Sequence, residues 1–131
     1  MDNNYNKPDL KSLYYDKEMK KIPSLDGKTI AITGTTSGTG FIAAKTVANK
    51  GARTLLLNRK TDRSKKSYDL LKEICPKGNF LDIECDLQSF KSVTKAAEKI
   101  IDLCNKDGLD ALCNNAGVMA LKDQATIDGF D

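Results

Sequence analysis

The sequence predicts an α/β protein built on a parallel β-sheet, and two features carry this prediction. Short apolar runs of strand length alternate with helix-length segments, and the connections between them are short. The strands are expected at 29–33, 53–58, 79–85 and 109–113. The helices are expected at 39–50, 61–74 and 88–105. Strands joined through helices run parallel, so the order β-α-β-α-β-α-β indicates a sheet with crossover helices.

Each predicted helix has an apolar side made by residues three or four positions apart. In the first helix these residues are Phe41, Ala44, Val47 and Ala48. In the second they are Leu70, Leu71 and Ile74. The third helix has the longest stripe, formed by Phe90, Val93, Ala97, Ile100, Ile101 and Cys104. These sides are expected to pack on the sheet.

Handedness limits how the four strands can be arranged. Right-handed crossovers favour the spatial order 3-2-1-4, which is that of a Rossmann-type sheet. Such sheets have six or more strands, with helices on both faces. A sheet truncated after its fourth strand therefore has an open apolar edge, through which the chain can self-associate.

The regular pattern defines one domain. Residues 25–131 form it, and residues 1–24 form a polar N-terminal extension. Tyr14 and Tyr15 are expected to dock this extension on the domain, with one short helix. A chain of 131 residues is long enough for one hydrophobic core.

Charge and hydropathy exclude several classes of protein. The 21 Lys and Arg residues are mixed with 18 acidic residues, for a net charge of +3, so there is no basic stripe to follow nucleic acid. No apolar run approaches the roughly 18–20 residues of a membrane span. The N-terminus also lacks the apolar core of a signal peptide. The sequence therefore predicts a cytoplasmic protein that binds no nucleic acid.

Histidine is absent from the chain, which removes Ser-His-Asp hydrolase and Cys-His protease chemistry. No zinc site or other metal site is predicted either. The four cysteines form no C-x-x-C pair. They are Cys75, Cys85, Cys104 and Cys113. We expect them to be free, mostly buried thiols in a reducing compartment.

A glycine-rich stretch, "TGTTSGTG" at 33–40, joins the first predicted strand to the first helix. A helix N-terminus presents unpaired N–H groups and partial positive charge, which favour a phosphate there. Gly34 permits the tight turn, Gly38 lets the backbone approach the phosphates, and Gly40 allows close packing of helix and strand. Hydroxyl groups around the anion are expected from Thr35, Thr36, Ser37 and Thr39.

Three short motifs together resemble those of the short-chain dehydrogenase/reductase family. "TGTTSGTG" is similar to the family's glycine motif, with Thr39 in place of its usual isoleucine. "CDL" at 85–87 resembles its adenine-contacting pair, and "NNAG" at 114–117 resembles the motif after its fourth strand. The segments "LLLNRK", "NNAGVM" and "DGFD" look most like retinol-dehydrogenase-like members. The resemblance covers residues 25–131 and implies that they are the N-terminal half of a dinucleotide-binding Rossmann domain.

The resemblance implies a set of residues that contact a nicotinamide dinucleotide. Gly34, Gly38 and Gly40 would line the pyrophosphate and the adenosine ribose. Asp86 would accept a hydrogen bond from the adenine amino group, with Leu87 beside it. The wall near the two riboses would be lined by Asn114, Ala116 and Gly117. An alternative for "NNAG" is a loop that ties the sheet together.

The end of the second strand bears on the choice of cofactor. An acidic residue there would bind the adenosine 2′-hydroxyl and repel a 2′-phosphate. This chain has "NRK" instead, and Arg59 can give a phosphate a bidentate contact. The sequence therefore predicts NADP(H) in preference to NAD(H), the alternative being a solvated surface arginine.

The family's catalysis needs a serine, a tyrosine and a lysine in a later segment, and no catalytic residue is identified in 1–131. One Tyr-x-x-x-Lys, Tyr68 and Lys72, lies on the second predicted helix and is attributed to coincidence. We therefore predict the cofactor-binding half of an NADP(H)-dependent oxidoreductase of apolar alcohols or carbonyls, inactive alone. The alternative is a non-catalytic protein that binds nucleotide or pairs with a partner. A methyltransferase use of the fold is disfavoured by the G-x-x-x-G-x-G spacing and "NNAG".

Overall fold

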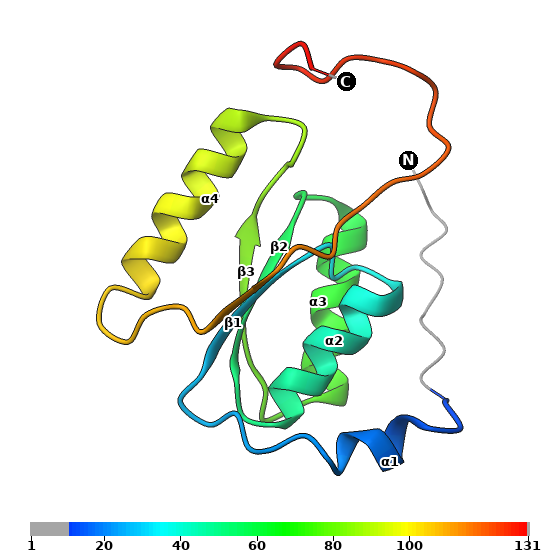
Figure 1. The fold of residues 1–131 in the computed structure, drawn as a ribbon, viewed down its shortest axis with the longest axis vertical. Helices are drawn as coiled ribbons and strands as arrows, with labels where there is room; N and C mark the ends of the chain where they lie inside the picture. The colour runs from blue at the N-terminus through cyan, green and yellow to red at the C-terminus, as the bar shows by residue number, and fades with distance from the viewer. Residues whose placement is uncertain (1–10, 131) are drawn as a thin grey trace.

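The structure is a computed structural model that describes residues 11–130, with four helices and four strands in that range (Figure 1). The strands are β1 (Thr29–Thr33), β2 (Arg53–Asn58), β3 (Asn79–Glu84) and β4 (Ala111–Cys113). The helices are α1 (Tyr15–Met19), α2 (Gly38–Asn49), α3 (Asp62–Ile74) and α4 (Phe90–Leu103). None of these helices has the length and apolar character that crossing a bilayer requires.

The four strands form one parallel sheet in the order β3-β2-β1-β4. This confirms the predicted strand order and the α/β, Rossmann-like class. Thr29 of β1 lies opposite Arg53 of β2, and Ile30 lies opposite Ala111 of β4. Because β1 is central and every strand runs the same way, all four carboxyl ends meet at one edge of the sheet.

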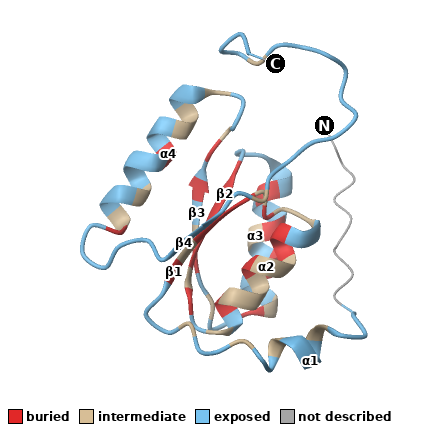
Figure 2. Cartoon of the chain, in the orientation of Figure 1, coloured by how far each residue is buried: buried red, intermediate tan, exposed pale blue. Residues whose placement is uncertain are grey.

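The helices cover both faces of the sheet, with α2 and α3 on one side and α4 on the other (Figures 1 and 2). The core under α2 and α3 includes Ile32, Phe41 and Leu71, all at most 1% exposed. A smaller core lies under α4 and includes Leu55 and Ile83. Alternate residues of β1 and β2 therefore enter different cores, as expected for strands buried on both faces.

Helix α4 buries only part of its apolar stripe against the sheet. Ala96 and Cys104 are buried, but Phe90 is 59% exposed and Ile101 is 66% exposed. Residues 90, 97 and 101 share one edge of the helix and face solvent, so the prediction that they pack on the sheet was wrong. The reason is that the apolar arc is wider than the part of it that β2 and β3 can cover. Arg53 also holds the end of α4, because its Nη2 donates to Leu103 O at 3.1 Å.

Strand β4 is an edge strand that pairs with β1, and all three of its residues are exposed. Leu112 is 52% exposed, and Cys113 is exposed while the other three cysteines are buried free thiols. Asp110 fixes the start of β4, since its Oδ2 accepts from Thr29 N at 2.8 Å and its Oδ1 from Lys28 Nζ at 3.0 Å. The Thr29 N–H and then the Lys28 ammonium hold the pKa of Asp110 below its ordinary value.

Both ends of the described chain lie against helices. In the N-terminal extension, Tyr15 Oη lies 2.8 Å from Thr46 Oγ1 of α2, and Lys45 Nζ lies 4.5 Å from the Tyr15 ring centre. Tyr14 is 66% exposed, so Tyr15 provides the docking contact. At the other end, Asp128 Oδ2 accepts from Phe90 N at 2.6 Å, at the first residue of α4.

Candidate functional site

Four loops meet at the edge of the sheet where the strands end. They are 34–37 after β1, 59–61 after β2, 85–89 after β3 and 114–117 after β4. In open α/β sheets the crevice outside the carboxyl ends of the strands is where ligands bind. Every residue that the sequence predicts for the cofactor site lies in one of these loops or in the first turn of α2.

The loop after β1 requires glycine at three positions, for two reasons. Gly34 and Gly38 have φ angles of +70° and +56°, in the left-handed region that favours glycine. Gly40 has no such φ, but a Cβ on it would collide with Gly34 O and the Asn115 side chain. Gly34 is also crowded, since a Cβ there would lie 2.9 Å from Ala116 Cα. The loop is therefore folded tightly on itself and against the segment after β4.

Asn58, the last residue of β2, holds the glycine loop through two hydrogen bonds to Thr35. Its Oδ1 accepts from Thr35 N at 2.8 Å, and its Nδ2 donates to Thr35 Oγ1 at 2.7 Å. Both residues are buried, at 7% and 0% exposed. The expectation that Thr35 offers its hydroxyl to an anion is therefore wrong, because that hydroxyl is buried on Asn58. Ser67 Oγ of α3 completes the support by donating to Thr35 O at 3.4 Å.

Asn115 ties the segment after β4 to the same loop. Its Nδ2 donates to Thr33 O at 3.0 Å and to Gly34 O at 3.1 Å. The N–H groups of Asn115 and Ala116 both donate to Thr33 Oγ1, at 3.1 and 2.9 Å. Sequence reasoning passed over Asn58 and Asn115. The sequence signal for both was an asparagine at the end of a strand or two residues after it, beside a loop whose backbone groups need hydrogen-bond partners.

The N-terminus of α2 is open at this edge. Ser37 is its N-cap residue but makes no side-chain bond to the helix, whereas Thr61 and Ser89 cap α3 and α4. The helical ladder of α2 begins at Phe41, whose N–H donates to Ser37 O at 3.3 Å. The N–H groups of the first turn are thus without helical partners, and that turn contains no acidic residue. Such an end favours an anion.

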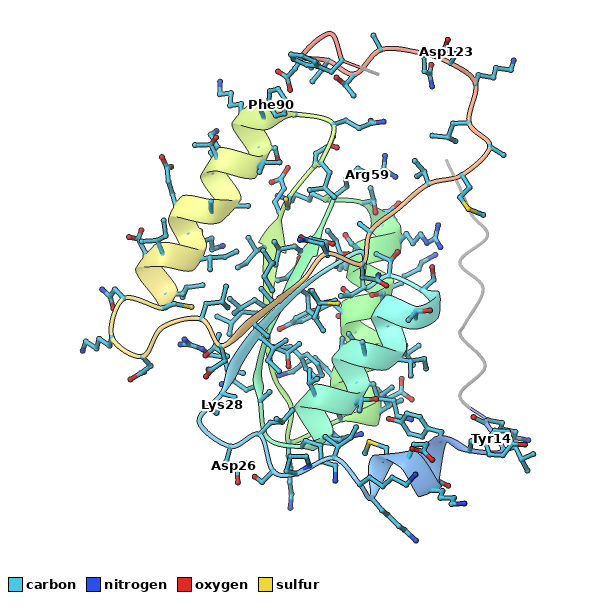
Figure 3. The ribbon with its side chains drawn as sticks, viewed as in Figure 1. Tyr14, Asp26, Lys28, Arg59, Phe90 and Asp123 are labelled. Carbon is cyan, nitrogen blue, oxygen red and sulfur yellow. The ribbon has the colours of Figure 1, made fainter. Side chains whose placement is uncertain are left out.

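Basic side chains lie at the same edge of the sheet. Arg59 and Lys60 follow β2 directly and are exposed, and Figure 3 shows Arg59 at the edge where β2 and β3 end. Arg63, in the first turn of α3, donates from Nη2 to Ser37 Oγ at 2.7 Å. Within residues 11–130 the ion pairs are Lys21–Glu18 and Lys28–Asp110, so none of these three cations is paired with a carboxylate there.

The segment after β3 presents Asp86 and Leu87. Asp86 is half-buried; its N–H donates to Ser92 Oγ at 2.9 Å and its Oδ1 accepts from Gln88 N at 3.0 Å. Leu87 is 51% exposed. Burial raises the pKa of the neighbouring Cys85 thiol, and the Asp86 charge raises it further, which keeps that thiol protonated at neutral pH.

The other predicted site residues lie at the surface of the same edge. Thr36 and Ser37 are half-buried in the glycine loop, and the exposed ones are Gly38, Thr39, Asn114, Ala116 and Gly117. Tyr68 and Lys72 lie elsewhere, because Tyr68 Oη donates to Phe80 O near the start of β3, at the opposite edge. Their spacing therefore places no tyrosine–lysine pair at the site.

A glycine turn into an open helix N-terminus, at the carboxyl edge of a 3-2-1-4 parallel sheet, defines a Rossmann-type domain. The family model for short chain dehydrogenase matches residues 28–129. The chain belongs to the short-chain dehydrogenase/reductase family, an oxidoreductase family whose members bind a nicotinamide dinucleotide and a substrate.

Relatives and solved structures agree with this assignment. The chain is 33% identical over 110 residues to an oxidoreductase of Schizosaccharomyces pombe, a match that covers 84% of this chain and 32% of that protein. A structure from Mycobacterium paratuberculosis matches with a TM-score of 0.73 at 32% identity, over 86% of this chain and 38% of that one.

L-sorbose reductase from Gluconobacter frateurii, solved with NADPH and L-sorbose, is also similar. It matches with a TM-score of 0.64 at 29% identity, over 80% of this chain and 40% of that chain. The chain spans about a third of the length of the curated relatives it matches. The narrower resemblance to retinol-dehydrogenase-like members stays a prediction.

Proposed function

We propose that this chain is the cofactor-binding half of an NADP(H)-dependent oxidoreductase that interconverts an apolar alcohol and its carbonyl. The observation that carries the proposal is the glycine loop, held from two sides by Asn58 and Asn115 and leading into an uncapped helix N-terminus. When bound, the nicotinamide dinucleotide supplies or accepts the hydride. The residues of this chain bind and orient it.

The edge of the sheet fits such a cofactor. Nothing lies within 4 Å of where a Cβ of Gly38 would be, so a phosphate can approach the backbone closely there. Thr36, Ser37 and Thr39 surround that approach, and the α2 N-terminus offers N–H donors to a pyrophosphate. At the adenine end we assign Asp86 as acceptor for the amino group, with Leu87 against the ring. The ribose wall is assigned to Asn114, Ala116 and Gly117.

The preference for NADP(H) is assigned to Arg59, which is exposed and unpaired among the described residues. Support comes from L-sorbose reductase, whose structure holds NADPH. We expect Arg59→Glu to weaken NADPH binding about tenfold or more, because a charge-assisted contact becomes a repulsion. NADH binding should change less than about twofold. Titration of each cofactor, followed by its fluorescence, measures both affinities.

The control for this variant is Lys77→Glu, which makes the same charge change in the turn before β3, at the opposite edge of the sheet. It should leave both affinities as in the wild type. If Arg59→Glu leaves NADPH affinity unchanged, Arg59 is a solvated surface side chain and the cofactor assignment is wrong.

Turnover is assigned to residues that these 131 do not include. Purified residues 1–131 are therefore expected to show no NADPH oxidation with aldehydes or ketones, because no catalytic tyrosine–lysine pair lies at the site. Measurable oxidation above a blank without protein would contradict this. The intact mass of the natural product, from immunoprecipitation against residues 60–75 and mass spectrometry, tests the wider proposal. A species well above 14.4 kDa would support half of a working reductase.

A non-catalytic, partner-pairing protein is the second candidate, and the exposed apolar surface beside β4 is the feature that bears on it. Leu112 shares the sheet face of Ala31, which is the face that α4 covers. Leu112 and the outer edge of α4, with Ile101, leave exposed apolar surface on that face. We propose that either further polypeptide or a second copy pairs with β4. A natural species of 14.4 kDa that forms dimers in solution would favour this candidate.

We also propose a cytoplasmic location. The four cysteines are free, and three of them are buried, Cys75 in the core under α2 and α3 and Cys85 and Cys104 in the core under α4. Unpaired thiols of this kind persist in a reducing compartment. Fractionation with a tagged natural product tests this, and recovery from an oxidising compartment would contradict it.

A further inference from the structure

Arg63 reaches from one helix N-terminus to another. It lies in the first turn of α3, and its Nη2 donates to Ser37 Oγ, at the N-cap of α2, at 2.7 Å. The two residues are 26 positions apart in the sequence. The side chain thus crosses from the β2–α3 connection to the mouth of the glycine loop.

This contact is not needed to complete either helix. The start of α3 is already capped, because Thr61 and Ser64 form a reciprocal capping box. Ser37 in turn receives Arg63 instead of capping α2. An arginine has five N–H donors in a planar fork, and a single hydrogen bond of Arg63 is present in the described part of the chain. Most of its donors therefore remain available for an anion.

The charge around Arg63 also favours an anion. Arg59 belongs to the same β2–α3 connection, and both guanidinium groups lack carboxylate partners within residues 11–130. The N-terminus of α2, with its partial positive charge, lies directly behind Ser37. The Arg63 guanidinium and the helix end therefore meet at Ser37, Arg59 lies four residues earlier in the same connection, and a dianion bound there would be stabilised by their positive charge.

We propose that Arg63 is a second specificity-determining residue, which binds the 2′-phosphate of NADP(H) opposite Arg59, while Ser37 positions its guanidinium before the cofactor arrives. This inference rests on the proposed NADP(H) function. A guanidinium held on Ser37 loses less side-chain entropy on binding than a free one, so the hydroxyl contributes to affinity without contacting the adenine or nicotinamide. Arg59 and Arg63 would then contact the same 2′-phosphate from two sides.

The test compares variants of the natural polypeptide, purified at the length at which cells produce it. Arg63→Gln is expected to weaken NADPH and 2′,5′-ADP binding about tenfold and to change NADH binding less than about twofold. Ser37→Ala should weaken NADPH by a smaller factor, and Arg63→Lys should recover part of the loss. The control is Lys66→Gln, which removes one exposed positive charge from the same helix. It should leave all three affinities unchanged.

The outcomes separate this inference from the proposed function. Equal losses for NADH and NADPH in Arg63→Gln would make Arg63 a support of the glycine loop and overturn the inference, leaving cofactor binding in place. No change in NADPH affinity would also overturn it. If the unmodified protein binds neither dinucleotide, the proposed function itself fails, and the inference fails with it.

Discussion

Asn58→Leu is expected to remove dinucleotide binding and to lower the free energy of unfolding by about 2–4 kcal/mol. The side chains are close in size, so the change removes hydrogen bonds and leaves little cavity. It leaves the N–H and the hydroxyl of Thr35 unpaired, in a residue that is 0% exposed. Each buried group without a partner costs about 1–3 kcal/mol. The glycine loop would therefore be free to leave its tight turn, and the phosphate approach at Gly38 would be lost.

Two further variants sharpen this prediction. Asn58→Asp keeps the acceptor for Thr35 N, and the Thr35 hydroxyl can turn to donate to the carboxylate, so its loss should be smaller. Asn79→Leu makes the same exchange as Asn58→Leu at the exposed start of β3 and should be nearly neutral. Chemical denaturation and cofactor titration measure both effects. Equal stabilities for Asn58→Leu and Asn79→Leu would show that the hydrogen bonds between Asn58 and Thr35 do not stabilise the fold.

The sequence predicted the strands and their order in the sheet well, and the reason is physical. Strands buried on both faces are continuous apolar runs, and glycines that end strands or begin helices mark the connections. The strand 29–33 and the strand 53–58 were expected with the bounds that β1 and β2 have. Handedness then left few orders for the sheet, and 3-2-1-4 is the one found.

The details of the site were less predictable, because they depend on which way single side chains point. "NRK" reads as one polar group at the end of a strand. In the structure Asn58 turns inward to Thr35 while Arg59 turns to solvent. Arg63 was not singled out either, since its partner Ser37 is 26 residues away and nothing local indicates the contact. In both cases the role of the side chain depends on a hydrogen bond to a residue far away in the sequence, Thr35 for Asn58 and Ser37 for Arg63.

Helix α4 and strand β4 show a related limit. An apolar stripe states how much surface a helix can bury, but the neighbours decide how much it does bury. Within residues 11–130, α4 packs on the sheet and meets Asp128 and Phe130 only at its first residue, so the edge with Phe90 and Ile101 stays exposed, as Leu112 does. Amphipathicity thus predicted a broader contact than these residues provide. The uncovered strip is the part of the fold that further polypeptide or a second copy would complete.

Gly40→Ala is expected to lower both stability and dinucleotide affinity, as Asn58→Leu does, although it adds a single methyl group. Gly40 has an ordinary helical backbone, so the effect comes from space and not from φ. The added Cβ would collide with Gly34 O and press on the Asn115 side chain, which itself donates to that oxygen at 3.1 Å. Because a backbone oxygen cannot turn aside, the whole loop must move. Overpacking of this kind costs about 1–3 kcal/mol of unfolding free energy.

The displaced loop would also lose its cofactor. Gly34 sets the turn that aims the loop across the N-terminus of α2, and moving its carbonyl changes where Ser37 and Gly38 lie. We expect NADPH and NADH affinities to fall together, by about tenfold or more, which distinguishes Gly40 from Arg59 and Arg63. Gly117→Ala is the comparison for stability, since nothing lies within 4 Å of its Cβ position. It should unfold like the wild type. If Gly40→Ala also does so and still binds both dinucleotides, the close approach of α2 to β1 is not what shapes the phosphate site.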